Sequence, residues 1–410
     1  MIKAVLLDLD DTLIQTGTEA FFSRYLWMLA GEFAHLLPPE KALRQIMAAY
    51  EQALDARNPT RPLYDRFLEN FSALLRRDPA ELKPLFERFY AGRYPELRPL
   101  VHPRPATSGL LSWLFERGYR VAVATDPAVP LTTILQRMDW GGISPEAYPF
   151  ALITCLETMH FGKPQPEYYG EILLRLDVEP HEAIMVGDRW TGDIAAAAQI
   201  GLNVYWVSGD GAPPPEDGTC PDGYGSYERF VSLVQSGWLE TLPPRSAGRE
   251  ALLVRLAVFP AAIDDLRRSY PPDVLECNPA EGEWSARDIV CHLRDYAAEE
   301  DRVRLERILS ETNPFLSANY DPWARASEYA RVSLDEAFEE FARLRAEMVA
   351  WLRGLPPDVW QRPARHAIFG PTTFGEMVHF TAQHDRTHLR QMRHAIETVL
   401  HACSEGTDSG

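Results

Sequence analysis

Short, uniformly apolar runs alternate with helical patterns along the first half of the chain, and this alternation restricts the folds open to it. Runs this short that are apolar at every position are typical of strands buried on both faces of a parallel sheet. Helical patterns at 110–117 and 132–138 lie on either side of the second run. The alternation predicts a doubly wound α/β fold over residues 1 to roughly 240. The predicted strands are 4–7, 121–124, 151–153, 183–186 and 204–207.

One interval does not fit the alternation, because about 90 residues separate the first two runs, far more than a crossover connection needs. Apolar residues within this interval repeat every three or four positions, which is the spacing of one helix face. We therefore expect an all-helical cap over about 15–100, with its aromatic rings packed inside it. The repeats are Phe22, Leu26, Leu29, Phe33 and Leu36, followed by Phe67, Phe71 and Leu74.

The second half of the chain has a different pattern. A Pro- and Gly-rich stretch at 208–225 and a helical segment at 227–234 come before a linker at 242–248. Beyond the linker the strand signal is lost, and four long helical patterns predict a C-terminal all-α four-helix bundle. They cover 250–269, 285–310, 333–354 and 373–400, so the expected domains are 1–245 and 247–402.

Three of the bundle helices carry their own start signals. Each begins with a hydroxyl residue followed three positions later by an acidic residue, the spacing of a capping box. The pairs are Ser285 and Asp288, Ser333 and Glu336, and Thr373 and Glu376.

Charge and cysteine content limit the partners and the compartment. The chain has 41 basic and 59 acidic side chains, a net charge of −18, which disfavours nucleic acid and anionic membranes as partners. Its five cysteines lie far apart without a Cys-x-x-Cys pair, and no leader or long apolar segment is recognisable. We therefore expect a soluble, cytoplasmic protein.

Polar residues follow three of the predicted strands. Asp8 and Asp10 come after the first strand, Thr125 after the second, and Asp188 after the fourth, with Asp193 five residues further on. The carboxyl ends of parallel strands meet at one edge, where open α/β sheets bind ligands. We expect these side chains to converge there.

These residues resemble the motifs of the haloacid dehalogenase superfamily. The superfamily pattern is Asp-x-Asp-x-Thr, then Ser or Thr, then Lys, then Gly-Asp-x-x-x-x-Asp, and every element occurs here in order. The lysine is Lys163, within Phe161-Gly162-Lys163-Pro164-Gln165-Pro166, a phrasing typical of the third motif. The resemblance covers about residues 1–240, including a helical cap between the first two motifs.

The resemblance implies phosphoryl transfer to an aspartate. Asp8 would attack phosphorus and form an aspartyl-phosphate, while Asp10 would protonate the leaving alcohol and later deprotonate the attacking water. Lys163 and Thr125 would contact the transferring phosphoryl oxygens. Family members that cleave carbon–halogen bonds lack the second carboxylate, so Asp10 favours a phosphatase. The expected substrate is a small phosphorylated metabolite.

The resemblance also implies a magnesium site. Mg²⁺ prefers oxygen ligands, and Asp8, the carbonyl oxygen of Asp10 and Asp188 would supply them. Asp193 would support the metal end of the site.

A second group of candidate residues lies in the predicted bundle. His384 and His388 are four residues apart on the last helix, so both rings point to one side, as a single metal ion requires. The same face carries Met377 and Phe380, which places it toward the bundle interior. His292 on the second helix could complete a three-histidine site.

This arrangement resembles the DinB/YfiT-type four-helix bundle over about residues 248–400, which has one histidine early in the second helix and a His-x-x-x-His pair in the last. The resemblance implies a transition metal, zinc or nickel. Relatives include thiol-dependent transferases and metal-dependent hydrolases, in which the ion activates a thiol or a water.

Three hypotheses follow for the whole chain. The first is a magnesium-dependent phosphatase with an appended metal-binding bundle. In the second, the main chemistry is a thiol-dependent transferase or hydrolase reaction in the bundle. The third makes the bundle a non-catalytic interaction module, with a homodimer as one of its forms.

Overall fold

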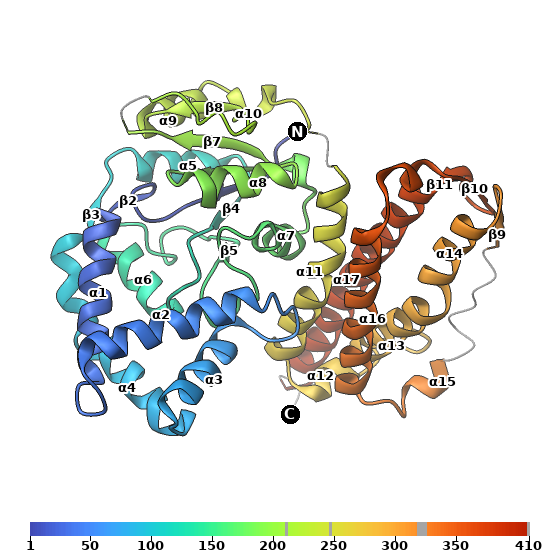
Figure 1. The fold of residues 1–410 in the computed structure, drawn as a ribbon, viewed down its shortest axis with the longest axis horizontal. Helices are drawn as coiled ribbons and strands as arrows, with labels where there is room; N and C mark the ends of the chain where they lie inside the picture. The colour runs from blue at the N-terminus through green and yellow to red at the C-terminus, as the bar shows by residue number, and fades with distance from the viewer. Residues whose placement is uncertain (210–211, 246–247, 318–325, 408–410) are drawn as a thin grey trace. The chain divides into compact units, whose positions relative to one another are not determined.

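The computed structural model describes residues 1–209, 212–245, 248–317 and 326–407. It divides into two compact units, Met1–Gly248 and Arg249–Gly410. The first unit contains a six-stranded sheet with helices and a helical cap, and the second consists mainly of long helices (Figure 1). The predicted fold class is confirmed.

The core sheet is parallel throughout, with the strand order β5-β4-β1-β6-β7-β8. The central strand β1 is fully buried and pairs with β4 on one side and β6 on the other, so that Leu7 lies opposite both Val123 and Val186. Every predicted run therefore forms a strand. The strands are β1 (Ala4–Leu7), β4 (Arg120–Val123), β5 (Leu152–Ile153), β6 (Ala183–Gly187), β7 (Asn203–Val207) and β8 (Gly223–Gly225).

The edge strand β8 was not predicted, because it lies in the Pro- and Gly-rich stretch and has no apolar run. Its Gly223 faces Tyr205 of β7 so closely that a Cβ atom would lie 2.8 Å from the Tyr205 ring. The strand is thus defined by pairing and by close backbone approach, which a search for apolar side chains does not detect.

Helices connect the core strands. The predicted helices at 110–117, 132–138 and 227–234 correspond to α5, α6 and α9. The core helices are α5 (Thr107–Glu116), α6 (Leu131–Trp140), α7 (Pro166–Arg175), α8 (Ala196–Gln199), α9 (Tyr227–Gln235) and α10 (Trp238–Thr241). A π-helical turn, η3 (Trp190–Ala195), lies between β6 and α8.

The cap consists of α1 (Thr18–Glu32), α2 (Pro39–Asp55), α3 (Leu63–Leu75) and α4 (Pro79–Gly92), followed by a 3₁₀ segment, η1 (Tyr94–Leu100). Figure 1 shows the four helices grouped together beside the core strands. The chain leaves the core through β2 (Ile14–Gln15) and returns through β3 (His102–Pro103), and these two short strands pair antiparallel. The cap thus begins and ends at neighbouring points.

The aromatic rings of the cap differ in how deeply they are buried. Phe33 and Phe71 are fully buried and pack edge to face, with ring centroids 5.2 Å apart, as expected of packing residues. The repeat from Phe22 to Leu36 does not lie on one helix, because α1 ends at Glu32, and the most buried residues of α1 include Phe21 and Tyr25. Phe22 is only half-buried, one position off the buried face.

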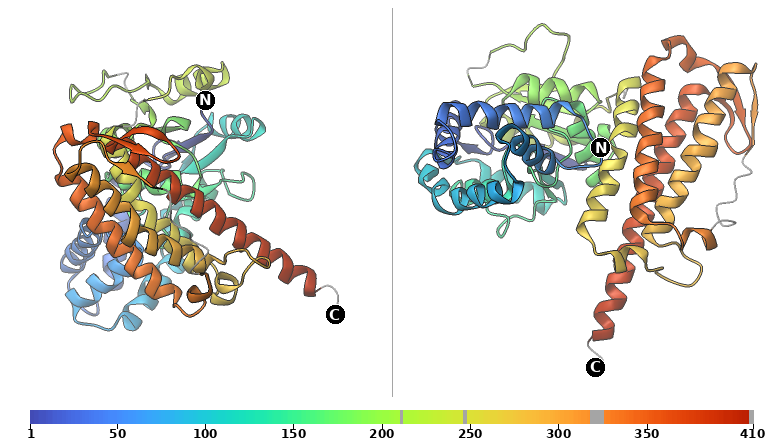
Figure 2. Two further views of the ribbon diagram at one scale, coloured as in Figure 1. Left: turned by 90° about the vertical axis from the view of Figure 1, so that its right-hand side faces the viewer. Right: turned by 60° about the horizontal axis from the view of Figure 1, so that its bottom comes forward.

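The second unit contains the four predicted helices. They are α11 (Arg249–Ser269), α13 (Ala286–Tyr296), α16 (Leu334–Gly354) and α17 (Phe374–Thr407), and α13 continues through a π-helical turn, η4 (Ala297–Asp301), into α14 (Arg302–Ser310). Shorter elements are α12 (Pro272–Glu276), α15 (Ala326–Tyr329) and η6 (Pro357–Gln361). In both views of Figure 2 the C-terminal end of α17 extends past the other bundle helices. Within the described segments, no helix has both the length and the apolar character that a bilayer span requires.

The bundle also carries a small sheet that was not predicted. Its strands are β9 (Phe315–Leu316), β10 (Pro363–His366) and β11 (Gly370–Thr373), in the order β11-β10-β9. The hairpin between β10 and β11 closes at Gly370, whose φ of 74° suits glycine. These strands have only two to four residues each, too few for a two-residue repeat of apolar side chains to be recognised.

The predicted start signals set where the bundle helices begin. The Ser285 hydroxyl accepts from the amide of Asp288 at 3.2 Å, and the Asp288 carboxylate accepts from the amide of Ser285 at 3.1 Å. Thr373 and Glu376 make the same reciprocal pair. At Ser333 the hydroxyl accepts from the amide of Glu336 at 3.5 Å. The capping box at Ser285 fixes the register of α13.

The close approach at the end of β6 generates a stability prediction. A Cβ atom on Gly187 would lie 2.3 Å from Oδ2 of the buried Asp193, so Gly187→Ala must displace that side chain. We expect a loss of about 1–3 kcal/mol in the free energy of unfolding, measured by denaturation of the full chain.

Gly109→Ala in α5 is the matched control, because nothing lies within 4 Å of its Cβ position. Replacing a helical glycine by alanine there should preserve or raise stability. Equal stability of the two variants would contradict the packing argument.

Candidate functional site

The carboxyl ends of the three central strands bring the predicted polar residues together. Asp8 follows β1 directly, and its amide donates to the carbonyl of Val186 in β6 at 2.9 Å. Thr125 follows β4, and Asp188 follows β6. The parallel register therefore puts all three residues at one edge of the sheet, as predicted.

Carboxylates and one ammonium group form the centre of this site. Oxygen atoms of Asp8, Asp188 and Asp193 all lie within 4.8 Å of one another. The Nζ atom of Lys163 is 2.6 Å from Asp8 Oδ1 and 2.6 Å from Asp193 Oδ1, and its side chain is almost fully buried. The second oxygen of Asp193 accepts from the amide of Arg189 at 2.9 Å. Asp193 thus holds Lys163 in place and also adds an oxygen atom to the cluster of three carboxylates.

Burial and mutual repulsion shape the protonation of these groups. Burial raises the pKa of Asp8 well above its ordinary value, despite the adjacent Lys163. Burial and the charge of Asp193 raise the pKa of Asp188 to about 6. Burial alone would lower the pKa of Lys163, but the carboxylates of Asp193 and Asp8 raise it well above its ordinary value. The lysine therefore stays cationic among groups that repel one another.

Asp10 is held by a residue that sequence analysis missed. Its Oδ2 atom contacts Nη1 of Arg137 in a buried ion pair. The guanidinium also lies 5.7 Å and 5.6 Å from the ring centroids of Phe21 and Phe22. The sequence contained a sign of this pair, because Arg137 lies on the same face of α6 as the apolar Ile134 and Met138. A charged side chain on a buried face is almost always paired with an opposite charge.

The backbone carbonyl of Thr125 is held by hydrogen bonds from two neighbouring hydroxyl groups. Its carbonyl oxygen accepts from the hydroxyl of Tyr168 at 2.7 Å and from that of Thr154 at 2.8 Å. The next residue, Asp126, forms an ion pair with Arg189 at 3.4 Å and accepts from the hydroxyl of Tyr50 in α2 at 3.2 Å. The last contact joins the cap to the strand end.

Two further contacts hold the cap against the core. The Gln165 side chain donates to the carbonyl of Leu54 at 2.8 Å, and Arg57 pairs with Glu167 at 3.0 Å. Gln165 is two residues from Lys163, so the segment that supplies the lysine also contacts the cap.

A cavity of about 370 Å³ lies between the cap and the strand ends. Asp8, Asp10, Thr125 and Asp188 line one part of it, and cap side chains line the remainder. Its volume is in the usual range for small-molecule sites, roughly 300–1,000 Å³.

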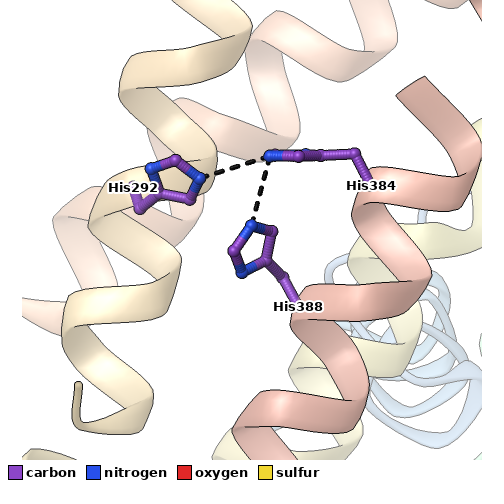
Figure 3. A group of neighbouring side chains, drawn as sticks. All are labelled: His292, His384 and His388. Atoms are coloured by element: carbon purple, nitrogen blue, oxygen red, sulfur yellow. Dashed lines mark hydrogen bonds between the residues drawn. The ribbon is translucent and has the colours of Figure 1, made fainter. Parts of the chain in front are cut away.

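The three predicted histidines of the bundle converge as well. His292 comes from α13, and His384 and His388 come from α17, with their rings directed at one another (Figure 3). The Nε2 atom of His384 is 3.3 Å from Nε2 of His292 and 3.1 Å from Nε2 of His388. The three imidazoles lie close enough together for each to offer a nitrogen atom to one metal ion.

The environment keeps these imidazoles neutral. Burial and the neighbouring His388 lower the pKa of His292 to about 3, and burial with both neighbouring rings lowers that of His384 to about 2. The Nδ1 atom of His388 lies 2.9 Å from the side-chain oxygen of Gln391. Because an amide oxygen can only accept, the proton sits on Nδ1 and the Nε2 lone pair faces the other two rings.

A second cavity, of about 400 Å³, opens beside the histidines. Its lining combines aromatic rings with a few polar groups, among them Asp301, Arg304 and His366. His366 belongs to the small sheet, and the ring of Tyr296 stacks on His384 with centroids 4.1 Å apart. The other histidines of α17, His379, His394 and His401, are exposed.

The sequence analysis also missed a buried network of charged residues next to His384. Nη2 of Arg345 in α16 is 2.8 Å from Oδ1 of Asp385 and 3.8 Å from Oδ2 of Asp301. The Thr381 hydroxyl donates to the other oxygen of Asp301 at 2.9 Å. This network ties the residue after His384 to two other helices and restrains the helix segment that carries the pair.

Comparison with known proteins gives two family matches and several relatives. A model of the haloacid dehalogenase-like hydrolase family matches residues 2–201, and a model of the DinB superfamily matches residues 254–392. The glyceraldehyde 3-phosphate phosphatase of Pyrococcus abyssi is 27% identical over 50% of this chain and 81% of its own length. The phosphoserine phosphatase of Thermus thermophilus is 27% identical over 54% of this chain and 94% of its own.

For the bundle, the structure of YfiT from Bacillus subtilis is similar. That protein is described as a probable metal-dependent hydrolase with an unusual four-helix bundle topology. It is 19% identical, covers 38% of this chain and 90% of its own, and has a TM-score of 0.33. The family matches confirm both resemblances: the chain joins a haloacid dehalogenase-like hydrolase domain to a domain of the DinB superfamily.

Proposed function

We propose that the first unit is a magnesium-dependent phosphatase that hydrolyses a small phosphate ester through an aspartyl-phosphate on Asp8. The observation that carries the proposal is the contact of Lys163 with Asp8, beside a cavity that Asp10 also lines. The nucleophile, a fixed cation and a second carboxylate thus meet at one place. The names of the two phosphatase relatives support the same reaction class.

The two carboxylates divide the reaction into two displacements. An Asp8 oxygen forms a bond to phosphorus as the ester bond to the alcohol breaks, and Asp10 gives a proton to the leaving alkoxide. Water then attacks phosphorus, Asp10 takes its proton, and the bond to Asp8 breaks. Lys163 neutralises negative charge on the phosphoryl oxygens in both steps, and Thr125 donates a hydrogen bond to them.

The donor set fits a magnesium ion. Carboxylate oxygens of three residues lie within 4.8 Å of one another, and hard divalent ions prefer such ligands. Asp8, the Asp10 carbonyl and Asp188 would hold the ion, with Asp193 supporting that end of the site. When bound, Mg²⁺ would offset the charge of the phosphoryl group. Without the ion these carboxylates repel one another, and a bound cation would reduce this repulsion.

Replacement of the nucleophile tests the proposal directly. Asp8→Asn should lower phosphate release from a panel of small esters, including glyceraldehyde 3-phosphate and phosphoserine, by at least about 10³-fold. Chelation with EDTA should stop release by the wild type, and added Mg²⁺ should restore it. Asp139→Asn, at an exposed position of α6, is the control and should keep full activity. Turnover by Asp8→Asn would refute the nucleophile assignment.

We infer that Arg137 positions the Asp10 carboxylate. Arg137→Met leaves that carboxylate buried without its cation, so the free energy of unfolding should fall by about 3–5 kcal/mol. In the double variant with Asp10→Asn the neutral amide no longer needs a cation, and part of the loss should be recovered. Denaturant titration of the full chain measures both losses, and equal losses would show that the ion pair contributes nothing.

For the second unit we propose a transition-metal centre, zinc or nickel, held by His292, His384 and His388. The convergence of three neutral imidazole nitrogens supports it, and so does the adjoining cavity, which leaves room for a further ligand. A thiol or water at that position would be activated for transfer or hydrolysis. An interaction or dimerisation role for the bundle remains the alternative hypothesis.

The metal content of purified variants tests this centre. The wild type should carry about one zinc or nickel ion per chain, and His384→Ala should lose at least about 90% of it, because two histidines bind far more weakly than three. His379→Ala, at an exposed position of the same helix, should keep the ion. Metal retained by His384→Ala would contradict the site. Thiol consumption lost in His384→Ala but not in Asp8→Asn would favour bundle catalysis over the interaction role.

A further inference from the structure

The cavity between cap and core has two chemically different parts. The part at the strand ends holds the carboxylates and Thr125, where the phosphoryl group would bind. The part inside the cap is lined by apolar side chains from all four cap helices, including Phe22, Leu26, Ile46, Met47, Phe67 and Phe86. The leaving alcohol of any ester bound at Asp8 would have to occupy this apolar part.

We propose that the substrate is a phosphate monoester of an apolar alcohol, aromatic or branched aliphatic, and that the cap selects it. This inference rests on the proposed phosphatase function and names the substrate class of the same site. The reason is the apolar surface that the cap presents to the alcohol part of the ester. Covering this surface with an apolar group removes it from water, which is favourable.

The charges around the cavity disfavour a second anionic group on the substrate. Among the described residues that line it, Arg189 is the cationic one, and it is already paired with Asp126 at 3.4 Å. Glu19 and Asp126 line the same cavity. A carboxylate or a second phosphate on the alcohol would therefore meet like charges without a cation to balance it.

The hydroxyl groups of the cap are also engaged within the protein. Tyr25 and Tyr90 share a hydrogen bond between their hydroxyls at 3.1 Å, and the Tyr50 hydroxyl donates to Asp126. A polyhydroxylated alcohol would lose hydrogen bonds to water on entry and would have to break these contacts to regain partners. An apolar alcohol has no such requirement.

Leu26 and Trp27 offer a matched pair of variants on α1. Leu26 is half-buried and lines the cavity, whereas its neighbour Trp27 is 49% exposed and does not belong to the lining. Leu26→Gln places an amide in the apolar part, and Trp27→Gln makes a comparable change at the surface. Neither residue takes part in the proposed chemistry.

The experiment compares kcat/KM for benzyl phosphate and 3-methylbutyl phosphate with that for glycerol 1-phosphate and phosphoserine, using the full chain and Mg²⁺. We expect the apolar esters to be favoured by at least about 10-fold. Leu26→Gln should lower the ratio of kcat/KM between the apolar and the polar esters by about 10-fold or more, while Trp27→Gln leaves this ratio unchanged. Preference for the polar esters, or an equal loss on both classes in Leu26→Gln, would overturn the inference.

A binding measurement separates this inference from the phosphatase proposal. If no ester is hydrolysed, the proposed reaction fails, but calorimetric binding of benzylphosphonate and of 3-hydroxypropylphosphonate still reports on the cavity. Tighter binding of the benzyl compound, weakened in Leu26→Gln and unchanged in Trp27→Gln, would support the inference. Equal or weaker binding of the benzyl compound would overturn it.

Discussion

The arrangement of the carboxylates at the edge of the core sheet depends on the buried ammonium group of Lys163. It lies between Asp8, at the end of the central strand, and Asp193, in the turn after β6, at 2.6 Å from each. Without it the three neighbouring carboxylates would repel one another and could not remain together in a buried site. The same segment contacts the cap through Gln165, so one stretch of chain joins the strand ends, the charges and the cavity.

Much of this edge could be predicted from the sequence, because parallel strands bring their carboxyl ends to one place. Asp8, Thr125 and Asp188 needed only the strand assignments and the motif order. Arg137 and the cap lining did not follow, since they depend on how helices dock on the core. A helical period identifies a face but not what that face meets, and Phe22 shows this: it was expected to pack and instead borders the cavity.

In the bundle, too, the sequence predicted what depends on spacing within one helix but not the contacts between distant segments. His384 and His388 share a face by helical geometry, and the capping box at Ser285 fixes the register of His292. The buried network around Arg345 joins residues from three helices, and no spacing within one helix encodes it. The small sheet is similar, since its strands are defined by pairing between distant segments.

The paired strands β2 and β3 have a consequence for how such a chain can diversify. Because Ile14 lies opposite Pro103, the chain enters and leaves the cap at two adjacent points, so the cap is one continuous insertion in the core unit. A different insertion with the same spacing between its ends would not require a change in the order of the core strands. The proposed division, with the chemistry in the core and the selectivity in the cap, would therefore let a lineage acquire a new substrate by exchanging one continuous segment.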